Sequence, residues 1–169
     1  IPPEVLKQLQ EDAQKAKELD DQFPGGHGLL GFVLLLQSRG QRDVTRRASD
    51  LRESLTAYDR AISLCHGEED ELATLLTSRS TNYTELANHT VDLTKQKQQE
   101  LLLKAKADGE RATQLKPRYP EYAWGALGNA LEDLAWILEK TEYYPQAVQA
   151  FTNEINARDY VAQPWLDRG

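Results

Sequence analysis

The stretch Tyr122–Tyr160, YAWGALGNALEDLAWILEKTEYYPQAVQAFTNEINARDY, guides the interpretation of the whole chain. In its first half, Trp124 is followed four positions later by Gly128. On a helix this spacing belongs to one apolar stripe, with a small residue where a second helix can cross closely. In its second half, Ala147 and Phe151 show the same four-residue step. The stretch therefore predicts two helices that run back on each other and meet at Gly128.

The pattern W-x2-L-G at Trp124–Gly128, followed by A-x3-F at Ala147–Phe151, resembles the tetratricopeptide repeat (TPR), a helix–turn–helix unit. The resemblance implies an all-α fold. It implies more specifically a right-handed α-α superhelix, or TPR-like solenoid, of about three antiparallel helical hairpins with flanking helical segments. Solenoids of this kind bind other proteins and carry out no catalysis themselves.

Weaker copies of the pattern lie upstream. Gly31 and Ser80 take the place of Gly128, and Ser54–Tyr58 and Ala105–Gly109 supply the matching steps on the returning helices. The three pattern positions are spaced more widely than the roughly 34 residues of a standard TPR unit. Each hairpin is therefore expected to be about two to four helical turns longer than in that unit.

We expect one domain over residues 1–169, made of repeated hairpins. Residues 1–22 form either a capping helix or the second helix of a repeat whose first half lies upstream. Trp165 and Gly169 repeat the spacing of Trp124 and Gly128, so the last residues begin a further repeat or form a C-terminal cap. The predicted repeats are 27–66, 68–117 and 119–158, and the final segment is 161–169.

Turn and capping signals set the expected helix ends. The glycine-rich run Gly25–Gly28 is typical of a flexible turn ahead of an apolar helix over 29–37. Asp43 is a candidate N-cap for the next helix. The break inside the second repeat is expected near Asn88–Thr90, with Asp92 as a candidate cap for the returning helix.

Composition limits the classes of function. The chain is 40% hydrophobic and 28% charged, which is ordinary for a soluble protein, and its net charge of −7 argues against a nucleic-acid binder. No apolar run approaches the ~20 residues of a membrane-spanning helix. The single cysteine, Cys65, excludes an intramolecular disulfide. Because the sequence holds no methionine, Ile1 is read as the start of a processed protein or an excised segment, and the compartment stays open.

No group of residues predicts catalysis, a cofactor or a metal ion. His27, His66 and His89 lie at expected helix ends and form no H-x3-H pair. Cys65 and His66 are adjacent, so their side chains point in different directions, whereas zinc needs a spaced set of ligands. We therefore expect no enzyme activity, no catalytic residue, no cofactor and no metal site.

The TPR resemblance implies a binding groove, because the first helix of each hairpin lines the concave face of such solenoids. Counted from each pattern position, this groove changes from apolar through hydroxyl-bearing to acidic. A partner segment, extended or helical, that is apolar at one end and basic at the other would complement it. The lysines with which chaperone-docking TPR proteins hold a C-terminal carboxylate are absent. The predicted groove residues are Phe32, Leu35, Leu36, Thr77, Thr81, Thr84, Glu85, Asn129, Glu132 and Asp133.

The expected function is protein–protein interaction, as a scaffold, adaptor or complex-assembly factor. An alternative is a helical accessory or regulatory domain of a larger multidomain protein or enzyme. Self-association through the apolar surface of Leu29–Leu36 is a further alternative. The arginines at positions 39, 42, 46, 47 and 52 form the one basic concentration, which we interpret as a solvated turn and helix surface, with contact to an acidic partner or an anionic surface as the alternative.

Overall fold

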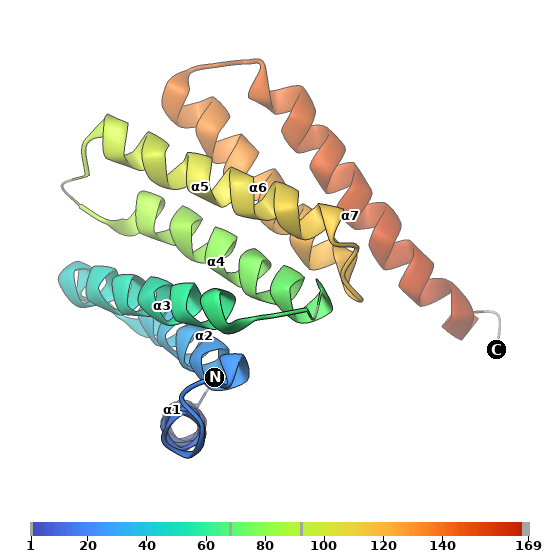
Figure 1. Cartoon of the computed structure of the whole chain (residues 1–169). Coiled ribbons are helices and arrows are strands. Elements are labelled where there is room, and N and C mark those ends of the chain that lie inside the picture. The colour runs from blue at the N-terminus through green and yellow to red at the C-terminus, as the bar shows by residue number, and fades with distance from the viewer. Residues whose placement is uncertain (1, 68, 92, 167–169) are drawn as a thin grey trace.

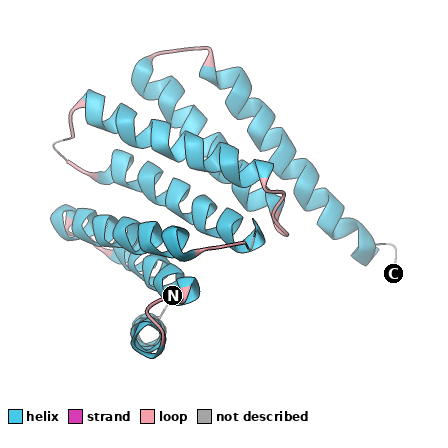
Figure 2. Ribbon diagram, viewed as in Figure 1, coloured by secondary structure: helices cyan, strands magenta, loops and turns pink. Residues whose placement is uncertain are grey.

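The computed structural model describes residues 2–67, 69–91 and 93–166, and this part of the chain is all-α (Figures 1 and 2). The all-α prediction is confirmed, and no strand occurs among these residues. The helices are α1 (Pro3–Leu19), α2 (Pro24–Gly40), α3 (Val44–Leu64), α4 (Glu69–His89), α5 (Lys95–Gln114), α6 (Pro120–Leu138) and α7 (Tyr143–Leu166).

Helices that follow one another in the sequence pack side by side. Helices α2 and α3, α4 and α5, and α6 and α7 form three antiparallel hairpins, and α1 packs on α2 (Figure 1). Helix α4 also contacts both α2 and α6, whereas the described backbones of α3, α5 and α7 do not approach one another. The first helices of the hairpins are therefore in contact with one another, and the second helices are separated.

The two helices of each hairpin cross at the positions that the sequence pattern predicts. A Cβ atom added at Gly128 would lie 2.5 Å from Cε1 of Phe151, and one added at Gly31 would lie 3.0 Å from the ring of Tyr58. In the middle hairpin, the Ser80 hydroxyl donates to the carbonyl of Ala105 over 2.8 Å. The predicted contact at Gly128 is confirmed, and a comparable contact occurs in each hairpin.

Helix α2 contains the apolar segment 29–37 and is covered by α1, α3 and α4. Val33, Leu34 and Leu35 are buried, while Phe32 keeps 44% of its surface exposed. Burial on several sides explains why this helix is apolar around nearly its whole circumference.

The expected N-cap of α3 is confirmed. Asp43 Oδ1 accepts hydrogen bonds from the backbone N–H groups of Thr45 and Arg46, at 2.8 and 3.2 Å, and so caps α3. The break between α4 and α5 falls after His89, as expected. The N-cap of α5 is Thr94, whose hydroxyl accepts from the N–H of Lys97, so the prediction of Asp92 as this cap is wrong. Asp92 itself lies outside the described residues.

The expected turn at Gly25–Gly28 is wrong, because these residues belong to the first turns of α2. Pro24 begins the helix, since its fixed φ suits a first helical position. The glycines serve close packing instead. A Cβ at Gly26 would lie 3.3 Å from the Cβ of Ala16 in α1, and one at Gly28 would lie 2.8 Å from Cδ2 of Leu75 in α4.

The expected helix end near Arg158 is also wrong. Helix α7 continues to Leu166, so residues 161–166 extend the same helix and do not start a new one. No glycine or proline lies between Arg158 and Pro164, so residues 159–163 can continue the helical backbone, and the helix ends two residues after Pro164. Residues 167–169 lie outside the described residues. At the other end of the chain, α1 stops at Leu19 and not at residue 22.

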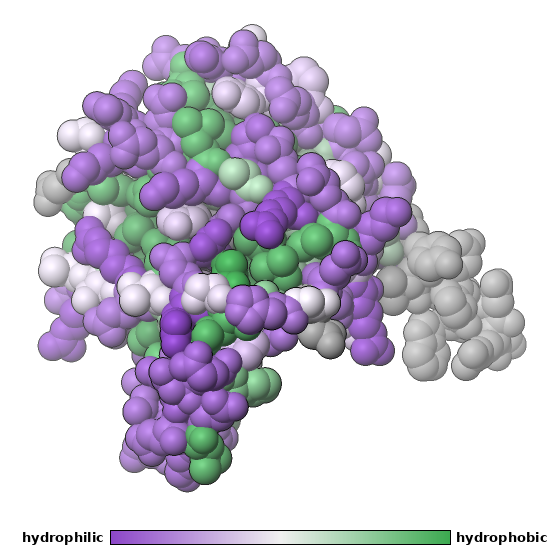
Figure 3. Space-filling model, viewed as in Figure 1, coloured by the Kyte–Doolittle hydropathy of each residue, from purple (hydrophilic) through white to green (hydrophobic). Residues whose placement is uncertain are grey.

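In the view that faces α3, α4 and α5, most of the surface is hydrophilic, and hydrophobic residues show between the helices (Figure 3). Helix α1, at the lower edge, is covered mainly by hydrophilic residues in this view. None of the helices in the described ranges combines the length and the hydropathy needed to cross a bilayer.

The contact at Gly128 gives a test of the helix packing. Gly128→Leu should lower the free energy of unfolding by about 2 kcal/mol or more, because the added side chain overlaps the ring of Phe151. Urea denaturation followed by circular dichroism measures this. Gly40→Leu is the matched control, since a Cβ there meets nothing within 4 Å. Equal stability of the two variants would contradict the packing of α6 against α7.

Candidate functional site

The predicted groove residues lie along two adjoining pockets on the face formed by α2, α4 and α6. The larger pocket encloses about 550 Å³ and the smaller about 300 Å³. Both are lined by Arg39, Thr81, Ala126 and Asn129, so they form one continuous surface, which we call the groove. All of the predicted residues line one or both pockets except Leu36. That they bind a partner stays a prediction.

The two pockets differ in chemical character. The larger pocket is lined by apolar and aromatic residues from α2 and from the start of α6, including Phe32, Leu35 and Tyr122. The smaller pocket is mainly polar, with Glu85, Glu132 and Asp133 among its lining residues. The larger pocket is thus the more apolar and the smaller the more acidic. Each pocket takes residues from α2, α4 and α6, so the expected change from apolar to acidic along the three hairpins stays a prediction.

Sequence reasoning missed several lining residues, because it counted positions only on the middle of each first helix. Tyr119 and Glu121 come from the start of α6, and Glu154 comes from α7. Glu154 reaches the groove because Gly125 has no side chain, and a Cβ at that position would lie 3.0 Å from Glu154 Oε2. Gly125 lies about one helical turn before Gly128. It is the feature of the sequence that indicates room for a side chain from the second helix of the hairpin.

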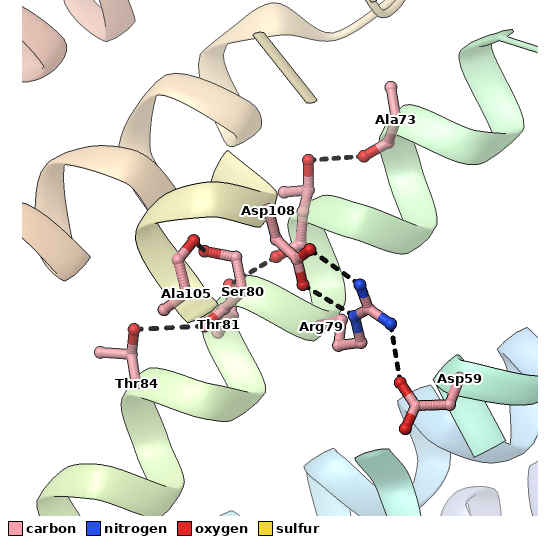
Figure 4. Close-up of polar contacts among 9 residues, drawn as sticks. Asp59, Ala73, Arg79, Ser80, Thr81, Thr84, Ala105 and Asp108 are labelled. Atoms are coloured by element: carbon pink, nitrogen blue, oxygen red, sulfur yellow. Dashed lines mark hydrogen bonds and ion pairs between the residues drawn. The ribbon is translucent and has the colours of Figure 1, made fainter. Parts of the chain in front are cut away.

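Four threonines of α4 line the groove, namely Thr74, Thr77, Thr81 and Thr84, and their hydroxyl protons are used within the helix. Figure 4 shows this for Thr81 and Thr84. Thr77 donates to the carbonyl of Ala73 at 2.8 Å, and Thr81 and Thr84 donate to the carbonyls four residues before them at 3.1 and 3.2 Å. A hydroxyl has one donor and two acceptor lone pairs. The threonines therefore offer oxygen acceptors and methyl groups to the groove.

Glu85 does not contribute the unpaired acidic charge that the sequence suggested. Its two carboxylate oxygens lie 3.0 Å from Arg39 Nε and 2.9 Å from an Arg47 guanidinium nitrogen. These arginines belong to the cluster that we interpret as solvated surface; the side chain of Arg39 is indeed exposed, whereas that of Arg47 is largely buried. The charge of Glu85 is thus compensated inside the protein.

Asp133 remains on the acidic side of the groove, beside the exposed Glu132. Its Oδ2 accepts a hydrogen bond of 2.7 Å from the Asn88 amide. Burial raises the pKa of Asp133 above its ordinary value, and the charge of Glu132 raises it further; the hydrogen bond from Asn88 and the nearby His89 oppose this shift. The folded protein therefore disfavours the ionised form of Asp133.

The side of α4 away from the threonines is fixed by Arg79 (Figure 4). Its guanidinium donates to both oxygens of Asp108 on α5, at 2.7 and 2.8 Å, and to Asp59 on α3 at 2.7 Å. Burial acts to lower the pKa of Arg79, but Asp108 and Asp59 outweigh it and raise the pKa. Arg79 thus joins three helices and fixes the rotation of α4 that turns its threonines toward the groove.

Within the described residues, no three histidine, cysteine, aspartate or glutamate side chains come together closely enough to hold a metal ion. Comparison with protein-family models, with curated proteins and with solved structures gives no match for this chain. The TPR resemblance therefore depends on the residue pattern and remains a hypothesis.

The raised pKa of Asp133 predicts how its removal changes stability. A carboxyl group with a raised pKa in the folded state favours folding when protonated and opposes it when ionised. Asp133→Asn should therefore raise the free energy of unfolding at neutral pH, since the introduced amide oxygen can still accept from Asn88. The gain should vanish below the ordinary Asp value of 3.8, where wild-type Asp133 is protonated too. Thermal melts of the wild type and of Asp133→Asn, recorded from neutral pH down to below 3.8, measure this difference in stability.

The exposed Asp12→Asn, on α1, is the control for that experiment, and we expect it to show no comparable gain. A neutral-pH loss of stability in Asp133→Asn would contradict the assignment.

Removal of Arg79 should be costly, because Asp108 would be left nearly buried and unpaired. We expect Arg79→Ala to lower the free energy of unfolding by about 2 to 3 kcal/mol, somewhat below the loss for a fully buried pair. Asp108→Asn in the same background should recover part of the loss. Urea denaturation measures both, with the exposed Arg52→Ala as control. A loss equal to that of the control would contradict the bridging role.

Proposed function

We propose that the chain is a TPR-like right-handed solenoid whose groove on α2, α4 and α6 binds a segment of another protein. In this proposal the protein acts as a non-catalytic scaffold, adaptor or complex-assembly factor. The observation that carries the proposal is the groove itself, in which the first helices of all three hairpins supply lining residues.

The helix packing supports the repeat part of the proposal. Each hairpin has a close contact at its pattern position, at Gly31, Ser80 and Gly128. The first helices contact one another in order along the chain, and the second helices stay apart. Such an arrangement curves a stack of hairpins toward its first helices, and stacked repeats use curved surfaces of this kind for binding.

The exposed aromatic residues support the binding part. Phe32 is 44%, Tyr119 50% and Tyr122 62% exposed, and all three line the larger pocket. Apolar and aromatic side chains gathered in a concave site with a few polar groups are typical of ligand-binding surfaces. Together the two pockets suit several consecutive residues of a partner better than a single small molecule.

The proposal can be tested with defined peptides. A displayed library of random peptides, each about a dozen residues long, is selected on the full chain, and the affinity of each selected peptide is measured by fluorescence polarisation. Asn129 is exposed and lines both pockets, so Asn129→Arg should fill the groove without disturbing the core. We expect it to weaken binding by about tenfold or more.

Gln96→Arg is the matched control, because Gln96 is exposed on α5 and lines neither pocket. Its affinity for the peptides should equal that of the wild type. Failure to select any binding peptide, or equal affinity of the Asn129→Arg and Gln96→Arg variants, would contradict the proposed function.

A further inference from the structure

We infer that Glu121 receives a lysine or arginine side chain of the bound segment, so the partner is basic where it meets the start of α6 and apolar where it meets α2. The inference rests on the proposed function and adds the chemistry of the partner. Glu121 is only 8% exposed, it lines the larger pocket, and its Oε2 is buried without a hydrogen-bond partner.

No described cation compensates Glu121. Arg118 stacks on the ring of Tyr119, with its guanidinium carbon 5.4 Å from the ring centroid. Arg39 is paired with Glu85 at the boundary between the two pockets. A buried carboxylate oxygen without a hydrogen-bond partner costs free energy, whereas the position of Glu121 at the start of α6 favours its charge. A partner cation would offset this cost.

Other polar groups of the larger pocket also favour a partner side chain that carries hydrogen-bond donors. The hydroxyl protons of Thr77 and Thr81 are used within α4, so these side chains present acceptors. Glu154 adds a second carboxylate on the α6 side of the pocket, although its Oε1 is paired with the exposed Arg158. Ammonium and guanidinium groups carry only donors. A lysine or arginine therefore complements this end of the pocket, whereas an acidic side chain would meet carboxylates.

Aromatic residues at the same end add to the selectivity for a cation. Tyr119 and Tyr122 pack edge to face, with ring centroids 6.3 Å apart, and both line the pocket with Glu121. Cations bind favourably over tyrosine rings, and the alkyl stem of lysine or arginine packs on apolar surface. The opposite side of the pocket, at Phe32 and Leu35, offers apolar contacts. Arg39 would repel a cation bound near Phe32 and Leu35. The basic residue of the segment is therefore expected at the start of α6, and its apolar residue at α2.

A double-mutant cycle on the selected library peptides tests the inference. We expect these peptides to share a lysine or arginine and an apolar residue. Glu121→Gln should weaken their binding by about tenfold, as should replacing the peptide lysine by norleucine, or its arginine by citrulline. The two changes together should weaken binding little more than either alone, because they remove the same contact. The control Glu53→Gln, on the exposed surface of α3, changes charge equally and should leave affinity unchanged.

A second variant, Tyr122→Ala, tests the inference even if Glu121→Gln changes the stability of the fold. Tyr122 is 62% exposed, so Tyr122→Ala should fold normally and weaken the binding of the basic peptides several-fold, and that of their norleucine or citrulline forms less. Additive effects in the cycle, or selected peptides without a basic residue, would overturn the inference. If Asn129→Arg still weakens those peptides, the proposed function survives. A Glu121→Gln variant that is more stable and binds as tightly as wild type would make Glu121 purely structural and overturn the inference as well.

Discussion

The close crossing of two helices inside each hairpin is the contact on which the rest of the structure depends. Gly128 leaves no room for a Cβ against Phe151, and Gly31 leaves little room against Tyr58. A small residue at this point lets a large aromatic ring of the returning helix fill the space above it. Because dispersion contacts weaken steeply with distance, close approach gives such an interface much of its stability. The middle hairpin uses the hydrogen bond from Ser80 to Ala105 for the same crossing.

These crossings place the first helices side by side. Arg79 then fixes how α4, the middle one of the three, is rotated about its own axis. Its ion pairs with Asp59 and Asp108 lie on one side of α4, and the threonines of α4 lie on the groove side. The rigid contacts and the candidate binding surface therefore occupy opposite sides of the same helix. A change that loosens the Arg79 side would also move the groove, even though it touches no groove residue.

The sequence predicted the helices, since these follow from residue spacing, and the TPR resemblance implied which residues share the face that carries the two pockets. Helix periodicity and the four-residue steps at Ser54–Tyr58 and Ala147–Phe151 are local features that a sequence displays directly. The errors have a different origin. Gly25, Gly26 and Gly28 indicate a turn by composition alone, because the helices they pack against cannot be seen from the sequence. The pairing of Glu85 with Arg47 joins residues far apart in the chain, so the sequence could not reveal that this charge is compensated.

The comparison of Glu85 with Glu121 shows why charge alone does not identify a binding residue. Both are glutamates that line the groove, but Glu85 meets two arginines and Glu121 meets none among the described residues. A compensated carboxylate contributes to the fold and has little left to offer a partner. A buried carboxylate oxygen without a hydrogen-bond partner costs free energy until a cation reaches it, so the free energy it costs becomes available for binding. Under the proposed function, selectivity for a basic partner would therefore follow from the carboxylate that the protein leaves unpaired, and not from its net charge of −7.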